Sequence, residues 1–262
     1  TNKSMKAITR QNIVDYKENH YVGANLLVVA AGDIDYGKFR EIKEKFSGIK
    51  TGRASLKTKT REKQSKPQVY FENKATDQTH LIIGSTACNL YDPKKYPAFL
   101  LDIILGGKMS SKFFRELREK LGLAYYVKTA FIPETDTGQF ILRIGVSHQN
   151  LEFTINKIIE ILRDVKNGGI TKKEFDLAKE NFRGKLALSL ETPDEVADYF
   201  GDQEIFGLKI QTPRQLLKKD LNVKLEDLQK VANELFRPDK INLASIGPHK
   251  NAYLYKKKLA NL

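Results

Sequence analysis

One pattern of helix, strand and glycine occurs twice in this chain, once near each end. Shifting the first copy by 215 residues aligns the two copies without a gap. The aligned pairs are Ile8 with Val223, Ile13 with Leu228, Tyr21 with Phe236, Leu26 with Ile241, Val28 with Leu243, and Gly32 with Gly247. A repeat of this length predicts two similar structural units. Only the glycines are identical and the pattern is common, so a chance match remains an alternative.

The repeat divides the chain into three parts. Residues 1–48 are interpreted as the C-terminal remnant of a first copy, with helices at 9–21 and 35–48 around a buried strand at 26–31. Residues 49–66 carry seven Lys or Arg and one Glu without an apolar period, as expected of an exposed basic linker. Residues 67–262 form the complete second copy. We therefore expect about 150 further residues of the first copy upstream of Thr1.

The second copy alternates between strand and helix patterns. We expect strands at 67–73, 78–87, 124–133, 139–147 and 241–246, and helices at 94–105, 110–121, 150–167, 171–190, 192–206, 212–220 and 224–236. Three helices begin with capping boxes, at Thr171, Thr192 and Thr212. The predicted fold class is α+β, a mainly antiparallel twisted sheet with helices packed on one face, preceded by the helix-strand-helix remnant.

Charge and hydropathy weigh against two classes of partner. The net charge is +13, but +6 of it lies in residues 49–66 and +4 in residues 249–262. Neither segment has the interleaved aromatic residues of a single-strand-binding surface, so we expect no nucleic-acid partner, and deletion of the linker would test that alternative. The longest apolar stretches fall far short of the roughly 20 residues of a membrane span, so we expect no membrane partner.

Cysteine and histidine give no metal site. Cys88 is the single cysteine, so no internal disulfide or cysteine cluster can form. His20, His80, His148 and His249 have no ligand-pair spacing, and His148 opens a predicted helix, where a solvated cap is expected.

The most distinctive segment runs from Leu105 to Val127. Ser110 or Ser111 can cap its helix, and Gly122 can end it. Phe114, Leu117 and Leu121 are expected on one helix face, with Arg118 beside them and held in direction.

The strand that follows this helix should alternate its side chains. Alternation places Tyr125 on one face with Val127, Thr129 and Phe131, and Tyr126 on the other. Arg118 and Tyr125 can then meet where the helix turns into the strand. Alternatively, Arg118 pairs with Glu119 or Asp102, and Tyr125 only packs.

Together, the glycine pair at 106–107, the serine pair at 110–111, the helix FRELRE at 114–119 and the strand entry GLAY at 122–125 resemble a known family. This is the second half of the pitrilysin/insulinase-type zinc metallopeptidases, which include the mitochondrial processing peptidase. Segment 8–33 resembles the end of that family's first half, and 223–247 the end of its second.

The resemblance implies a non-catalytic half of a zinc-dependent peptidase. Arg118 and Tyr125 would bind substrate and stabilise the oxyanion, while zinc would be held by an H-x-x-E-H helix on a missing half or partner subunit. Gly106, Gly107, Ser110 and Ser111 would form a substrate loop, unless the glycines only stop the preceding helix. The expected partners are the zinc-bearing half and a peptide. Residues 1–48 would self-associate or dock on a neighbour, and the chain alone would be inactive. A scaffolding relative without a role in proteolysis is the alternative.

Overall fold

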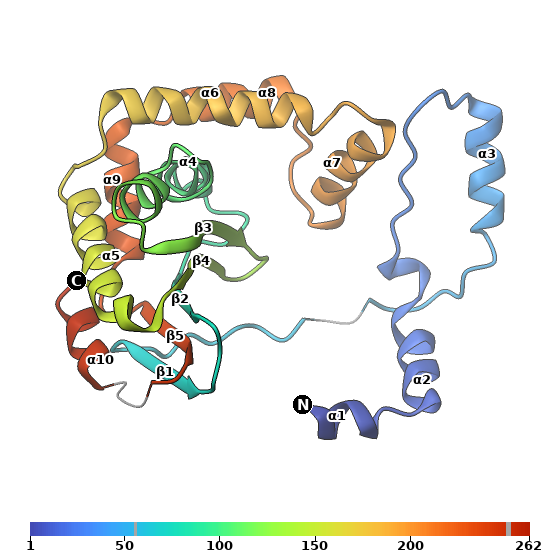
Figure 1. The fold of residues 1–262 in the computed structure, drawn as a ribbon. Coiled ribbons are helices and arrows are strands. Elements are labelled where there is room, and N and C mark those ends of the chain that lie inside the picture. Colours follow the sequence, from blue (N-terminus) through green and yellow to red (C-terminus); the bar gives the residue numbers. More distant parts are fainter. Residues whose placement is uncertain (55–56, 250–252) are drawn as a thin grey trace. The chain divides into compact units, whose positions relative to one another are not determined.

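The computed structural model describes residues 1–54, 57–249 and 253–262 (Figure 1). They form two compact units. The first comprises residues 1–59 and 187–211, and the second comprises residues 60–186 and 212–262. Because 187–211 belongs with the N-terminal residues, these units do not coincide with the division of the sequence into remnant, linker and repeat. That division stays a prediction.

The second unit contains a five-stranded sheet. Its strands are β1 (Gln68–Asn73), β2 (Thr79–Thr86), β3 (Ala124–Pro133), β4 (Gly138–Val146) and β5 (Ile241–Gly247). The spatial order is β1-β5-β2-β4-β3. Every neighbouring pair is antiparallel except β1 with β5. The predicted mainly antiparallel α+β fold is confirmed.

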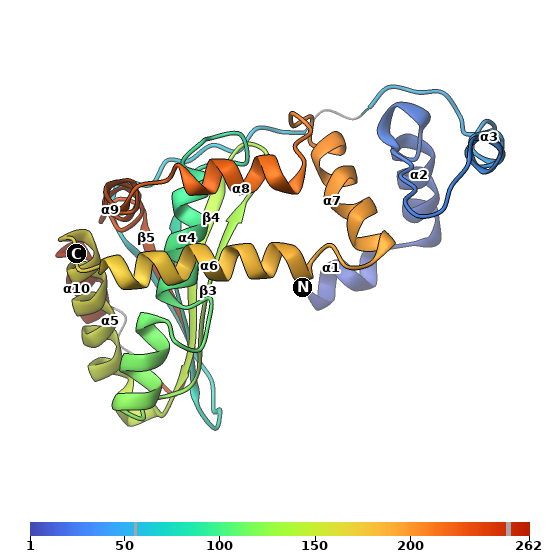
Figure 2. The same cartoon turned by 90° about the horizontal axis from the view of Figure 1, so that it is seen from above.

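Helices cover one face of this sheet (Figure 2). They are α4 (Lys95–Leu105), the π-helix η2 (Phe114–Lys120), α5 (Leu151–Lys166), α6 (Lys172–Leu188), α8 (Pro213–Leu221) and α9 (Leu225–Leu235), with the 3-10 turn η3 (His148–Asn150) before α5 and α10 (Tyr253–Ala260) near the C-terminus. Along β2, Leu81 and Ile83 are buried under the helices, while His80 and Ile82 are exposed. Alternate residues therefore separate a packed face from an open face.

The sequence specified the helix starts well. The Thr171 N–H donates to Glu174 Oε2 at 2.9 Å, and the Glu174 N–H donates to Thr171 Oγ1 at 3.2 Å. Equivalent boxes open α7 (Pro193–Ile205) at Thr192 and α8 at Thr212. Each box satisfies backbone donors that the first helical turn cannot pair.

The first unit contains α1 (Asn2–Ala7), α2 (Arg10–His20), the 3-10 turn η1 (Gly23–Asn25), α3 (Tyr36–Lys45) and α7. The prediction of a buried strand at 26–31 is wrong for this structure. The segment is extended but not paired, and Leu26, Leu27, Val28 and Val29 are 39–46% exposed. An apolar strand needs neighbouring strands to satisfy its backbone, and the described residues supply none beside it.

The offset of 215 residues recurs in the helix bounds. Adding 215 to the bounds of α2 (10–20) gives those of α9 (225–235), and α3 ends at Lys45 where α10 ends at Ala260. Residues 26–32 then correspond to β5, which lies between two other strands. Among the described residues, no helix is both long and apolar enough to cross a membrane.

Candidate functional site

The glycine pair joins the end of α4 to the middle of β3. The N–H groups of Gly106 and Gly107 both donate to the Asp102 carbonyl oxygen, at 3.0 and 2.9 Å. The Thr129 hydroxyl donates to Asp102 Oδ1 at 2.5 Å. Burial raises the pKa of Asp102, while the Thr129 hydrogen bond opposes that rise. The backbone of Gly106 lies so close to Thr129 that a Cβ would stand 2.6 Å from the Thr129 nitrogen.

The two serines lie in different environments. Ser110 is exposed, whereas Ser111 is buried, with 1% of its surface accessible. The Ser111 hydroxyl has no hydrogen-bond partner among the described residues. Neither serine caps the helix through its side chain, so that expectation is wrong. Ser111 instead contributes its carbonyl oxygen, which accepts from the Arg115 N–H at 2.9 Å.

The helix that carries Arg118 is wound as a π-helix over Phe114–Lys120. A wider turn changes which residues share a face, and this corrects the predicted stripe. Phe113 and Leu117 are buried, Phe114 is half-buried, and Leu121 is 42% exposed. Gly122 ends the helix with a φ of +60°, as expected of a residue in the left-handed region.

Arg118 is exposed on this helix, and its guanidinium carbon lies 5.1 Å above the centre of the Phe114 ring. Such a cation–π contact gives the side chain a preferred direction. The alternative ion pairs are not formed, because no printed pairing among the described residues joins Arg118 to Glu119 or Asp102. The guanidinium donors therefore remain available to a ligand.

Ion pairs hold the other side of the π-helix. Glu174 Oε1 lies 3.3 Å from both Lys112 Nζ and Arg115 Nη2. Arg115 Nε and Lys120 Nζ lie 3.3 and 2.8 Å from Glu116 Oε1. Burial on its own raises the pKa of Glu174, but its hydrogen bond from the Thr171 N–H and the Lys112 charge lower that pKa below its ordinary value. The carboxylate stays ionised and fixes the helix to the start of α6.

A β-bulge sets the direction of Tyr125. The register pairs Ala124 with Val146 and Tyr126 with Gly145, so Tyr125 is an extra residue in β3. It is 61% exposed, whereas Val127, Thr129 and Phe131 are buried. The prediction that Tyr125 shares their face is therefore wrong, because the bulge interrupts the alternation. Tyr126 does point to the opposite face from Val127.

Arg118 and Tyr125 thus lie on either side of Gly122, both exposed. The structure records no hydrogen bond between the guanidinium and the phenol. A permanent cation and a phenol are both hydrogen-bond donors, which suits them to hold a carbonyl oxygen and the negative charge that develops on it. Their role in substrate binding stays a prediction.

The open face of the sheet adds residues that the sequence analysis overlooked. Lys128 on β3 and Arg143 on β4 stand directly opposite each other and are exposed. Beside them, the Tyr126 hydroxyl lies 3.0 Å from His80 Nδ1. The signal was present in the alternation of β3, where Lys128 stands two residues after Tyr126.

The histidines do not fit a zinc site. His148 Nε2 lies 2.7 Å from the Thr76 carbonyl oxygen, so it must donate, and its Nδ1 accepts from the Thr79 hydroxyl at 2.9 Å. The Thr79 oxygen in turn accepts from His249 Nε2 at 2.6 Å. His148 is therefore part of a hydrogen-bond chain, not the expected solvated cap. Within the described ranges no group of three or more His, Cys, Asp or Glu could hold a metal ion.

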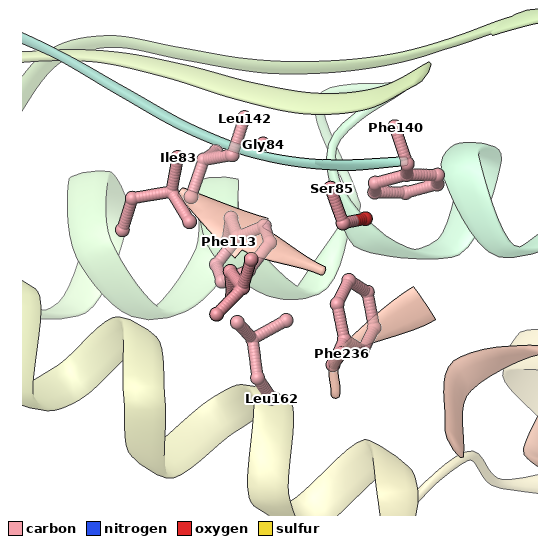
Figure 3. A pocket seen from close by; sticks show the side chains of 9 residues that line it. Ile83, Gly84, Ser85, Phe113, Phe140, Leu142, Leu162 and Phe236 are labelled. Atoms are coloured by element: carbon pink, nitrogen blue, oxygen red, sulfur yellow. The ribbon is translucent and has the colours of Figure 1, made fainter. Parts of the chain in front are cut away.

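A cavity between the sheet and the helices is also excluded as a ligand site (Figure 3). Its volume is about 10 Å³, and apart from Ser85 its lining is apolar, with Phe113, Phe140 and Phe236 around it. Ligand pockets measure about 300–1,000 Å³, so this is a packing void in the core.

Comparison with known proteins identifies the family. The sequence model of the family described as "Peptidase M16 inactive domain" matches residues 7–182. The chain belongs to this family. Two similar curated proteins are "Uncharacterized zinc protease YmxG" of Bacillus subtilis, 28% identical, and an "Uncharacterized zinc protease" of Rickettsia bellii, 29% identical. The matches cover 96% and 95% of this chain but 61% and 60% of those proteins. The M16 chain studied here thus spans about three fifths of their length.

Solved structures share the fold of this M16 domain. A peptidase M16 inactive domain from Pseudomonas fluorescens has a TM-score of 0.86 at 22% identity, over 95% of this chain and 60% of that one. A protease from Helicobacter pylori has a TM-score of 0.85 at 22% identity, over 94% and 60%. A chain of "Complex III2 from Candida albicans" has a TM-score of 0.80 at 16% identity, over 99% and 64%.

Proposed function

We propose that this chain is the non-catalytic half of a zinc-dependent peptidase and contributes substrate binding to a site completed by another half or subunit. Membership of the M16 inactive-domain family supports the non-catalytic part. The substrate-binding part rests on one observation, the exposed and unpaired Arg118 guanidinium on a helix braced by Glu174. Zinc would be held by the other half.

Arg118 and Tyr125 would donate hydrogen bonds to a carbonyl oxygen of the bound peptide. Donors fixed before substrate arrives stabilise the negative charge without the cost of reorienting them. The stacking of Arg118 on Phe114 and the bulge at Tyr125 provide such fixed positions.

The test is cleavage of a quenched fluorescent peptide library with added zinc. We expect no cleavage by this chain alone and cleavage when it is mixed with a zinc-bearing half. Arg118→Ala should lower kcat/KM about 100-fold or more, as loss of an oxyanion donor does. Arg214→Ala is the matched control, because Arg214 is an exposed arginine on α8. Unchanged cleavage by the Arg118→Ala mixture would favour a scaffold instead.

The partner would meet the first unit through residues 26–32. By the offset of 215 residues, this segment corresponds to β5, which pairs in parallel with β1 and antiparallel with β2. The segment is apolar on both faces and exposed, as expected of a central strand without its neighbours. We propose that a sheet of the zinc-bearing half receives it between two strands.

Hydrogen exchange tests this pairing. The amides of residues 27–31 should exchange fast in the isolated chain and at least 100-fold more slowly in the mixture, because both edges of a central strand are hydrogen-bonded. The amides of β5 serve as the internal control. Protection of 27–31 in the isolated chain at high concentration would instead indicate self-association.

A further inference from the structure

We propose that the open face of the sheet binds an acidic segment of polypeptide, through Lys128 and Arg143. This inference rests on the proposed function, because it names the class of peptide that the domain would receive. The two cations stand directly opposite each other on β3 and β4. Both side chains are exposed, and no described carboxylate pairs with either of them.

The charge on this face is of one sign over four strands. The residues that point outward from β2, β3, β4 and β5 include no Asp or Glu. Glu72, on the edge strand β1, is opposite Ile246, two strands away from β4. Like charges directly opposite on neighbouring strands destabilise a sheet. A carboxylate bound between Lys128 and Arg143 would remove that repulsion and gain charge-assisted hydrogen bonds.

The surface beside the cations is flat and preformed. A Cβ on Gly145 would lie 2.5 Å from Tyr126 Cε1, so the Tyr126 ring lies over this glycine. The ring extends across β4 toward His80, with the two ring centres 6.1 Å apart and their planes inclined by 28°. Ile82, which is opposite Arg143, and Ile246, which is opposite His80, are 41% and 39% exposed. Apolar and aromatic groups therefore adjoin the cations, as a peptide with mixed acidic and apolar side chains requires.

The same geometry disfavours a nucleic acid. Single-stranded nucleic acids need aromatic rings free to stack on successive bases and a groove of cations along the backbone. Here the Tyr126 ring lies against Gly145 and its hydroxyl is engaged by His80. The cations form one pair rather than a row.

Binding of labelled peptides by the full chain tests the proposal. The probes are two blocked 12-residue peptides with the same apolar residues, one with four Glu and one with Gln in their place, followed by fluorescence anisotropy at low salt. We expect the acidic peptide to bind about tenfold more tightly than the neutral one. The double variant Lys128→Gln with Arg143→Gln should remove this preference.

The control double variant, Lys173→Gln with Arg214→Gln, removes the same charge from exposed helix positions. It should retain the preference within twofold, and circular dichroism should show that both variants are folded. Equal binding of the two peptides, an equal loss in both double variants, or tighter binding of a labelled 12-nucleotide thymidine strand through the same cations would overturn the proposal.

These results are separable from cleavage. If Arg118→Ala abolishes cleavage by the mixture while acidic peptides show no advantage, the acidic preference is wrong and the proposed function stands. If acidic peptides bind through Lys128 and Arg143 while no mixture cleaves, the basic face stands and the peptidase role is wrong.

Discussion

Replacement of Gly106 by Ala should destabilise the sheet-containing unit. The new Cβ would stand 2.6 Å from the Thr129 nitrogen and 2.7 Å from both Thr129 Cγ2 and Oγ1. Because one of these atoms belongs to the backbone of a central β3 residue, rotation of a side chain cannot relieve the clash. Overpacking of this kind costs about 1–3 kcal/mol.

The same movement would break the hydrogen bond from Thr129 to Asp102. Burial already raises the pKa of Asp102, and loss of a partner to a buried polar group costs about 1–3 kcal/mol. Because the two effects share one displacement, we expect the free energy of unfolding to fall by about 2–4 kcal/mol in total. Urea unfolding followed by circular dichroism measures the change.

Gly184→Ala is the matched control. Gly184 lies within α6, and an added Cβ would have no atom within 4 Å. Since Ala favours helix more than Gly does, this variant should be more stable by about 0.5–1 kcal/mol. If Gly106→Ala instead unfolds at the same urea concentration as the unsubstituted chain, the close contact with Thr129 is refuted. The glycine pair would then be the flexible loop that the sequence left open.

Two further predictions concern titrating groups. Burial, followed by the charge of Asp92, raises the pKa of the Cys88 thiol to about 11, so iodoacetamide at pH 7 should alkylate it about 100-fold more slowly than a free cysteine peptide; equal rates would contradict this. Burial, and then the nearby His148, lower the pKa of His249, so the unfolded chain binds this proton more tightly and stability should fall as the pH drops below about 6.5. Urea midpoints at pH 7.5 and pH 5 should therefore differ less for His249→Asn than for the unsubstituted chain, and an equal difference would exclude His249 as a cause.

The candidate site was only partly predictable. The local signals of Gly122 and the Thr171 capping box were sufficient to place a helix end and a helix start. The direction of Tyr125 was not, because a bulge depends on how β3 aligns with β4, and that partner is 13 or more residues further along the chain. The π-helix likewise reflects packing of Phe113 and Leu117 into the core rather than any local preference.

The sequence by itself determined the α+β class, nearly all the element bounds of the second unit and the family, because periodicity, capping residues and glycines act within a few residues of chain. It also carried the repeat, whose 215-residue offset reappears in the bounds of α2 and α9. Tertiary structure alone decided that Lys128 and Arg143 meet across two strands, that Gly106 contacts Thr129, and that residues 26–31 lie unpaired. Each of these depends on which distant strands are present and in what register, and no local pattern of residues specifies that.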